Sequence, residues 1–371
     1  MENHQQNRNN TEDIDWIFGL KEEVPQFLEK LKGRKISGFF RYSLSGDLCG
    51  ENIKWGLGNT VFAVKIYYTL DLLDKLSQVE RKAMANFIKS FQKEDGTIYD
   101  PLVKRKAFLS LSNFLSAIKN FNFNKLFGKE TIRAETRQSV SALNLLGKKP
   151  DVYYQKFPKT EKEIKKYLSK LNWQKPWGAG SHFSHLIFFL KNSDLKDKEK
   201  LIDFAISWVN KLQSPEDGSW YKRNPSLQQK INGAMKIITG LKVAEKMNFQ
   251  HPEKLIDLCV SAKSDKDACN NFNIIYVLHY ASRVTENSYS FDEIKSFVTE
   301  RLRIYRNYYF SDIGGFSFLP EGANEVYYGA KITKGLKEPD IHGTCMFLWG
   351  ISIISQILGI DKKLGFEEFI P

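Results

Sequence analysis

The chain has 371 residues, of which 42% are hydrophobic and 13% aromatic, and its formal net charge at pH 7 is +12. This composition supplies a large apolar core, so it excludes an intrinsically disordered protein and indicates a globular one. The excess of positive charge favours an anionic partner. No compact basic face with interleaved aromatic residues stands out, so we do not expect the partner to be a nucleic acid.

The start of the chain and its cysteines predict a cytoplasmic protein. Residues 1–12 are polar and are predicted to form a disordered arm rather than a signal peptide, with residues 13–371 as a single domain. The four cysteines are widely spread, which suits reduced thiols. The longest apolar run, residues 345–360, contains polar residues and is shorter than the roughly 20 residues that span a bilayer, so no transmembrane segment is expected.

Helical periodicity covers most of the chain, and two kinds of helix alternate along it. Amphipathic segments with a charged face are predicted as outer helices at 20–32, 77–92, 161–171, 196–213, 252–262 and 290–308. Segments that are apolar on most sides are predicted as inner helices at 57–74, 133–147, 179–191, 228–246, 268–283 and 340–358. One more amphipathic segment, 104–120, is extra to this series. The alternation predicts an all-α fold, an (α/α)6 toroid whose inner helices surround a central cavity.

The turns after several outer helices share one pattern. Residues 92–99 and 213–220 each contain a Gln, then Asp-Gly, then an aromatic residue, and residues 312–316 resemble a shortened third copy. The Gln is expected to end the helix, and Asp-Gly provides a turn with positive φ. The aromatic residue is expected to fold under the next inner helix, so we assign these turns a structural role.

Each inner helix should present the polar residues of its first turn to the mouth of the cavity, where its unpaired backbone N–H groups also lie. Trp55 precedes the first inner helix and is a candidate for substrate binding, although a tryptophan beside glycines also suits close packing. Arg133, Glu135 and Arg137 open the second. Because buried ionisable groups are costly when unpaired, either an internal Arg–Glu ion pair or an anionic substrate must satisfy them.

The next inner helices add histidines, a cation and an amide. His182 and His185 lie three residues apart and share one helix face, which suits a metal pair, an acid and a base, or two hydrogen-bonded core residues. We take His182 as a candidate catalytic residue and His185 as a candidate substrate-binding residue. Lys230 and Asn271 are further candidates for substrate binding.

Two motifs resemble those of a known superfamily. Residues 267–272, DACNNF, resemble the D-x-C-x-x-F segment with which protein prenyltransferase β subunits supply two zinc ligands. Residues 340–345, DIHGTC, resemble the segment that carries their His ligand. Together with the Gln…Asp-Gly-aromatic turns, they make residues 50–360 similar to the terpenoid cyclase and protein prenyltransferase superfamily, whose members share an α/α toroid.

This resemblance implies a transferase or cyclase that acts on an isoprenoid or lipid-linked anionic substrate. It also implies a zinc ion held by Asp267, Cys269 and His342, and a second subunit or a second copy of the chain as a partner. The sequence departs from the superfamily at one point, because Gly343 stands where the family has its His, one residue after His342. That shift is a rotation of about 100° on a helix.

The Asp340 and His342 pair therefore has three interpretations. His342 is a zinc ligand, or Asp340 orients His342 as a catalytic acid or base, or Asp340 and Asp267 only cap their helices. A second function also remains open, because polysaccharide lyases, hydrolases and epimerases use α/α barrels with Arg, His and Tyr at the mouth. In that case the substrate would be an acidic glycan, and Tyr327 and Tyr328 would be candidate proton donors. A non-catalytic toroid that offers a groove to a partner is the third reading.

Overall fold

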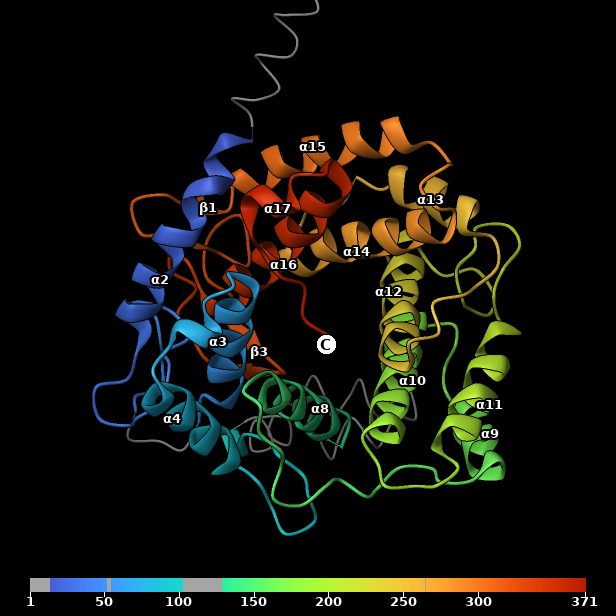
Figure 1. Ribbon diagram of the computed structural model, residues 1–371, viewed down its shortest axis with the longest axis horizontal. Helices are drawn as coiled ribbons and strands as arrows, with labels where there is room; N and C mark the ends of the chain where they lie inside the picture. Colours follow the sequence, from blue (N-terminus) through green and yellow to red (C-terminus); the bar gives the residue numbers. More distant parts are fainter. Residues whose placement is uncertain (1–13, 52–54, 103–128, 264) are drawn as a thin grey trace, which may run out of the picture.

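The computed structural model describes residues 14–51, 55–102, 129–263 and 265–371. This part of the chain is mostly helical (Figure 1), which confirms the predicted all-α class. Its strands form two short antiparallel pairs, β1 (Tyr309–Phe310) with β2 (Gly315–Phe316) and β3 (Val326–Tyr327) with β4 (Ala330–Lys331). The predicted arm, 1–12, and the extra amphipathic segment, 104–120, lie outside the described residues.

Helices occur at all twelve positions that the periodicity predicts. The amphipathic ones are α2 (Leu20–Leu31), α4 (Gln78–Lys89), α9 (Glu161–Ser169), α11 (Lys198–Asn210), α13 (Pro252–Val260) and α15 (Phe291–Arg306). The other six, which we call the inner helices, are α3 (Leu57–Thr69), α8 (Lys129–Leu145), α10 (Pro176–Lys191), α12 (Leu227–Ala244), α14 (Ala268–Val284) and α16 (Ile341–Leu358). They are largely apolar except α8, most of whose residues are polar or charged. Short helices complete the described part: η1 (Asp15–Gly19), η2 (Leu73–Lys75) and α17 (Asp361–Leu364).

The six inner helices form a closed series of contacts. Helix α3 packs on α8, α8 on α10, α10 on α12, α12 on α14 and α14 on α16, and α16 packs on α3 again. Outside this series, α4 packs on α3, α11 on α10, α13 on α14 and α15 on α16, so that the amphipathic helices lie around the inner ones (Figure 1). Contacts on both flanks explain why the inner helices other than α8 are apolar on nearly every side.

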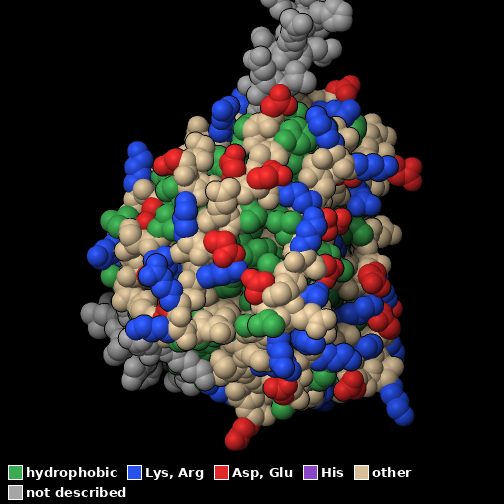
Figure 2. Space-filling view, turned by 60° about the vertical axis from the view of Figure 1, so that its left-hand side comes forward, with side chains coloured by type: hydrophobic (Ala, Val, Ile, Leu, Met, Phe, Trp, Pro, Cys, Tyr) green, Lys and Arg blue, Asp and Glu red, His purple; other side chains and the backbone are tan. Residues whose placement is uncertain are grey.

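The outer surface carries charges of both signs. Figure 2 shows one side of the molecule, on which Lys and Arg side chains are interspersed with Asp and Glu side chains around a group of hydrophobic ones. The net charge of +12 is therefore not gathered into one basic patch on this face. Helix α16 is long and apolar enough to cross a membrane, yet 78% of that stretch is buried inside the protein. Core helices of soluble proteins have the same length and composition, so this is weak evidence for a membrane span.

The Asp-Gly turns hold neighbouring segments together. Gly96 and Gly218 have φ angles of +78° and +72°, and a Cβ atom there would lie 2.6 Å from Tyr153 O and 2.5 Å from His251 O. Only glycine combines this backbone conformation with such a close approach. The Gln at the start of each turn reaches the same neighbouring segment, because the amide of Gln213 bonds to the backbone of Gln250. These turns have the structural role that the sequence predicts.

Residues 366–371 run across the inner helices and reach the middle of the molecule (Figure 1, marked C). The N–H of Glu367 donates to Thr69 O of α3 at 2.8 Å. The Glu368 carboxylate accepts a 2.8 Å hydrogen bond from Tyr280 of α14 and pairs with Lys242 of α12. Phe369 is 1% exposed. This segment, which we call the tail, is therefore fixed by several inner helices at once.

Candidate functional site

A cavity of about 470 Å³ lies between the inner helices. All six contribute lining residues, and none of these comes from the last turn of its helix. In α10, α14 and α16 the lining residues begin in the first turn, whereas in α3, α8 and α12 they begin further along the helix. The loop between β2 and β3, the β3–β4 hairpin and the tail complete the wall. The inner helices therefore face one shared cavity, but only α10, α14 and α16 do so with the first turns that the sequence pattern singles out.

Three basic side chains from three inner helices face this cavity. They are Lys65 of α3, Arg137 of α8 and Lys236 of α12. Burial, with the positive charges of Arg137 and Lys236 nearby, lowers the pKa of Lys65 to about 7. Burial and the charge of Arg137 lower the pKa of Lys236 to about 8, and burial also lowers the pKa of Arg137. The three groups are close enough to repel one another, so the cavity favours negative charge.

The Arg137 guanidinium has no counter-ion among the described residues. Its side chain is only 4% exposed, and its Nε and Nη1 atoms have no hydrogen-bond partner there. Lys65 donates to the neutral amide of Gln138, and Lys236 forms no ion pair within the described part of the chain. Burying an unpaired cation costs several kcal/mol. The arrangement is typical of a site that receives its negative charge from a ligand.

Glu135 does not supply that charge. Its carboxylate accepts the backbone N–H of Asp100 at 2.9 Å, and burial raises its pKa, with the Asp100 carboxylate nearby as a second cause. Arg133 lies against His182, with 2.6 Å between Nη2 and Nδ1, and over the ring of Tyr167. Within the described residues, the Arg–Glu ion pair that was one of the two predicted options is absent.

Only one of the two predicted histidines reaches the cavity. His182 is held at the side by the hydroxyl of Tyr167, 2.7 Å from Nδ1, and by the carboxylate of Glu130, 3.3 Å from Nε2. His185 lines the cavity, is 5% exposed, and has no partner for its Nδ1 atom among the described residues. Burial and the nearby positive charge of Arg137 lower its pKa well below the usual range, so its imidazole is neutral and can accept a hydrogen bond from a ligand.

Asp340 caps helix α16 and ties the preceding loop to it. Its Oδ1 accepts the N–H of Gly343 at 2.8 Å, and its Oδ2 accepts those of Phe318 and Asn324 at 2.8 and 3.1 Å. Burial raises its pKa to about 7 although these donors act in the opposite direction. Both oxygens are used by backbone donors, so the capping interpretation describes Asp340 and not an Asp–His catalytic pair.

His342 forms part of the cavity wall. Its imidazole stacks between the rings of Phe62 and Phe318, with centroid distances of 4.5 and 4.6 Å, and its Nδ1 atom lies 3.4 Å from the hydroxyl of Tyr42. Burial, with a smaller contribution from the charge of Lys65, lowers its pKa to about 3. The imidazole is therefore neutral at pH 7 and its faces are covered.

The residues that the resemblance assigns to zinc do not fit a metal site in this arrangement. Asp267 caps α14, and its two oxygens accept from the backbone and side-chain N–H groups of Asn270 at 2.8 and 2.9 Å. Burial raises the pKa of the Cys269 thiol to about 12, so the thiol is protonated at pH 7 as long as no metal ion is bound. No group of three or more His, Cys, Asp or Glu side chains in the described part of the chain is placed to hold a metal ion.

The structure gives a physical reason for the glycine at position 343. A Cβ atom on Gly343 would lie 2.4 Å from the backbone N of Phe318 and equally close to the carbonyl carbon of Ser317. The loop that precedes α16 therefore fills the space that a side chain at this position would need. Position 343 tolerates only glycine as long as this loop packs on the first turn of α16.

The remaining predicted residues divide between the cavity and the core. Tyr328 lines the cavity, has a φ angle of +46° and lies near the charges of Arg137 and Glu135. Trp55, Lys230 and Asn271 do not line it. Trp55 donates to Gly50 O, Lys230 pairs with Asp217 at 2.9 Å, and Asn271 donates to Asp267 O. Trp55, Lys230 and Asn271 therefore stabilise segments next to the inner helices and do not face the cavity.

Sequence reasoning missed Lys65 and Lys236, because it looked only at the first turns of the inner helices. A signal was present in the sequence. Each of the two lysines stands alone between large apolar residues, Val64 and Ile66 in one helix and Met235 and Ile237 in the other. A lysine flanked in this way on a helix that is buried all round is expected to face a cavity or a partner charge.

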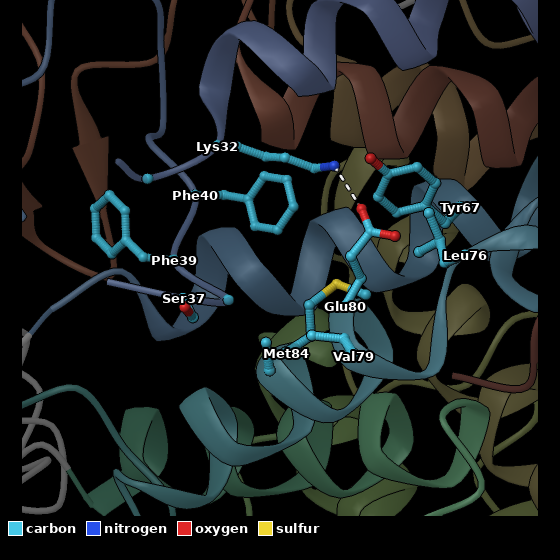
Figure 3. A pocket seen from close by; sticks show the side chains of 12 residues that line it. Lys32, Ser37, Phe39, Phe40, Tyr67, Leu76, Val79, Glu80 and Met84 are labelled. Atoms are coloured by element: carbon cyan, nitrogen blue, oxygen red, sulfur yellow. Dashed lines mark hydrogen bonds and ion pairs between the residues drawn. The ribbon is translucent and has the colours of Figure 1, made fainter. Parts of the chain in front are cut away.

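A second pocket of about 210 Å³ lies at the surface, between α4 and the residues that follow α2. Figure 3 shows the Lys32–Glu80 ion pair, 2.9 Å long, beside the ring of Tyr67 and the apolar side chains of Val79 and Met84. None of the residues predicted from the sequence lines this pocket. The central cavity, where several of them meet, is therefore the candidate functional site.

A scan against protein-family models and a search of curated proteins found no match to this sequence. The assignment of a function rests on the residues and geometry of the cavity.

Proposed function

We propose that the chain is an (α/α)6 toroid enzyme that binds an anionic ligand with an apolar portion in its central cavity. The closed series of contacts from α3 through α16 and back to α3, with outer helices packed against it, supports the toroid. The motifs similar to those of the terpenoid cyclase and protein prenyltransferase superfamily favour an isoprenoid or lipid-linked substrate. Fold-level similarity alone would be a weak argument, so the proposal rests on the site.

One observation carries the proposal. Arg137 is a buried guanidinium with two unpartnered donor atoms among the described residues, and Lys65 and Lys236 face the same cavity. Guanidinium and ammonium groups bind phosphate oxygens through short, charge-assisted hydrogen bonds. A phosphate, diphosphate or carboxylate would satisfy all three cations at once, which no described carboxylate does.

The rest of the wall suits an apolar chain. Phe62, Phe318 and Trp349 line the cavity together with Met235 and Met346. Aromatic and Met side chains contribute apolar area and adapt to chains of different shape. The volume of about 470 Å³ lies within the range of roughly 300–1,000 Å³ that small-molecule sites occupy.

The cations also supply chemistry. When a diphosphate or carboxylate group leaves, negative charge develops on its oxygens, and fixed positive groups in a water-poor cavity stabilise that charge. Burial raises the pKa of Tyr328, which keeps its hydroxyl protonated as a hydrogen-bond donor beside Arg137. Lys65, Arg137 and Lys236 thus bind the leaving group, and Tyr328 is in place to donate to it. The proposed reaction class is transfer or cyclisation with an anionic leaving group.

Titration calorimetry with inorganic diphosphate and with prenyl diphosphates tests this proposal. Diphosphate should bind, and a prenyl diphosphate should bind more tightly because it also buries apolar surface. Arg137→Met should weaken both by about 100-fold, since a buried charge-assisted contact contributes about 1.5–3 kcal/mol. Arg303→Met, at an exposed arginine on α15 that pairs with Glu300, is the matched control and should change neither. Absence of binding by any of these anions to the folded wild type would refute the proposal.

An acidic glycan is the second candidate ligand. Tyr328, Arg137 and His185 line one wall region of the same cavity, which is the set of groups that the carbohydrate-active alternative requires. Uronic acid oligosaccharides should then displace diphosphate, and Tyr328→Phe should abolish turnover while leaving binding intact. Displacement by glycans without any response to prenyl diphosphates would favour this alternative over the isoprenoid.

A further inference from the structure

Residues that line the central cavity can be ordered by their position along the axes of the inner helices, and we call such a position a level. Lys65 and Arg137 each lie four residues before the position at which the tail touches the same helix, Thr69 O in α3 and Ser141 Oγ in α8. Lys236 lies six residues before Lys242, which pairs with Glu368 of the tail. At a rise of about 1.5 Å per residue, the backbone positions of the three basic residues are about 6–9 Å closer to the N-terminal ends of the helices than the residues that the tail contacts.

Phe369 is the tail residue that meets the level of the cations. Its ring lies 5.0 Å from Lys65 Nζ and packs against Trp349 with 4.2 Å between ring centroids. Together with Pro371 it lines the cavity on this side. The anion-binding level is therefore bordered on its C-terminal side by an apolar side chain that is anchored at several points.

On the N-terminal side of the three cations, the cavity is lined in part by exposed residues. Phe62 and His342 lie one level closer to the N-terminal ends, and Trp177 and Val326, which also line the cavity, are 39% and 48% exposed. A ligand that enters past Trp177 and Val326 reaches the cations with its anionic group first. The rest of the ligand then lies between the cations and the mouth.

We infer that Phe369 is a specificity-determining residue, and that the cavity selects ligands whose anionic group is terminal. This inference rests on the proposed function and narrows its ligand class to monoesters of phosphate or diphosphate, or to terminal carboxylates. A substituent on the far side of the anion, as in a phosphodiester, would have to occupy the volume of the Phe369 ring. The tail cannot move aside without breaking the contacts of Glu367 and Glu368 with the inner helices.

Dodecyl phosphate and dodecyl methyl phosphate are suitable probes, because they share one alkyl chain and differ by a methyl group on the far side of the phosphorus. Calorimetry on the wild type should show tighter binding of the monoester by about 100-fold, a difference of about 2.7 kcal/mol. Part of that ratio reflects the extra charge of the monoester. Phe369→Ala removes the ring without changing any charge, so it should strengthen diester binding and reduce the ratio by about tenfold.

Ile370→Ala is the matched control, because this neighbouring side chain is 52% exposed, and it should leave the ratio unchanged. Phe369→Leu is the second variant if the alanine protein does not fold, and it should reduce the ratio by a smaller factor. A wild type that binds neither probe would overturn the proposed function itself. A wild type that binds the monoester, with the same ratio in folded Phe369 variants, would overturn only the assignment of Phe369.

Discussion

The imidazole of His342 stacks on the ring of Phe318, with 4.6 Å between the centroids and 29° between the planes. The two residues belong to the first turn of α16 and to the loop that Asp340 ties to it, so the wall of the cavity is fixed by the same contacts that begin the helix. The structural roles of His342 and Asp340 can therefore be tested by measuring the stability of variants, without any substrate.

His342→Phe should retain the stacking and remove a titrating group. Because burial lowers the pKa of His342 to about 3, the unfolded chain binds a proton below its ordinary pKa near 6.5 while the folded protein does not. Wild-type stability should therefore rise with pH between these values, with a contribution of up to about 1.4 kcal/mol per pH unit. Urea unfolding between about pH 4.5 and 6.5 should show a smaller slope for the variant. Equal slopes would mean that the imidazole titrates normally in the folded protein.

Asp340→Ala should be more destabilising than Asp267→Ala. The Asp340 side chain accepts three backbone N–H groups from two segments, whereas the donors to Asp267 belong to the first turn of its own helix. Loss of a helix cap alone costs about 1 kcal/mol, and each further buried donor left unpaired costs about 1–3 kcal/mol. We expect about 3 kcal/mol for Asp340 and about 1 kcal/mol for Asp267 by urea unfolding. The reverse order would contradict the assignment of Asp340 as the junction between loop and helix.

Gly343→Ala and Gly178→Ala form a matched pair at the starts of two inner helices. A Cβ atom at 343 would lie 2.4 Å from backbone atoms of the loop, whereas one at 178 meets nothing within 4 Å. The first change should cost more than about 2 kcal/mol through overpacking, and the second should stabilise by about 0.5–1 kcal/mol through helix propensity. Thermal unfolding of the two variants provides the comparison. A neutral Gly343→Ala would show that the loop does not pack on α16 in solution.

Lys65→Met should stabilise the protein and weaken anion binding at the same time. Burial lowers the pKa of Lys65 to about 7, below its ordinary value of 10.5, so the unfolded chain binds more protons between these values. Wild-type stability should therefore rise as the pH increases from about 7 to 10, and the variant should lose this dependence. At pH 7 we expect a gain of about 1–2 kcal/mol from removal of repulsion with Arg137 and Lys236. A loss of stability at every pH would argue that Lys65 has a counter-ion in the folded protein.

Elemental analysis tests the zinc site that the resemblance implies. With the Asp267 oxygens engaged by Asn270 and the Cys269 thiol protonated, we expect clearly less than one equivalent of zinc in protein purified without chelators. Addition of zinc should leave the melting temperature unchanged, because a ligand bound only by the folded state raises it. One equivalent of zinc in the wild type, absent in Cys269→Ala, would restore the metal hypothesis.

The helices could be predicted because their signal is local. An apolar stripe on α4 and an apolar surface all round α16 are both visible in a short window of sequence. The N-caps Asp267 and Asp340 are equally local, since each acceptor lies three residues before its backbone donor. The capping interpretation was therefore available from the sequence, although it could not be separated from catalysis there.

The candidate site was predicted only in part, because its other determinants are contacts between distant segments. Nothing near Phe369 in the sequence indicates that its ring lies beside Lys65, and nothing near Gly343 indicates that the backbone of Phe318 covers it. Attention to the helix starts identified Arg137, but the lysines sit in the middle of their helices. The first turns of the inner helices do not indicate how far along each helix the cavity extends.

The contact between α16 and α3 has a consequence for biosynthesis. A ribosome releases α3 long before it has made α16, so one flank of α3 lacks its partner for most of translation. Contacts of such high sequence separation slow folding and prolong exposure of apolar surface. We expect the nascent protein to depend on chaperones until residues 341–371 emerge, and fragments that lack them to aggregate.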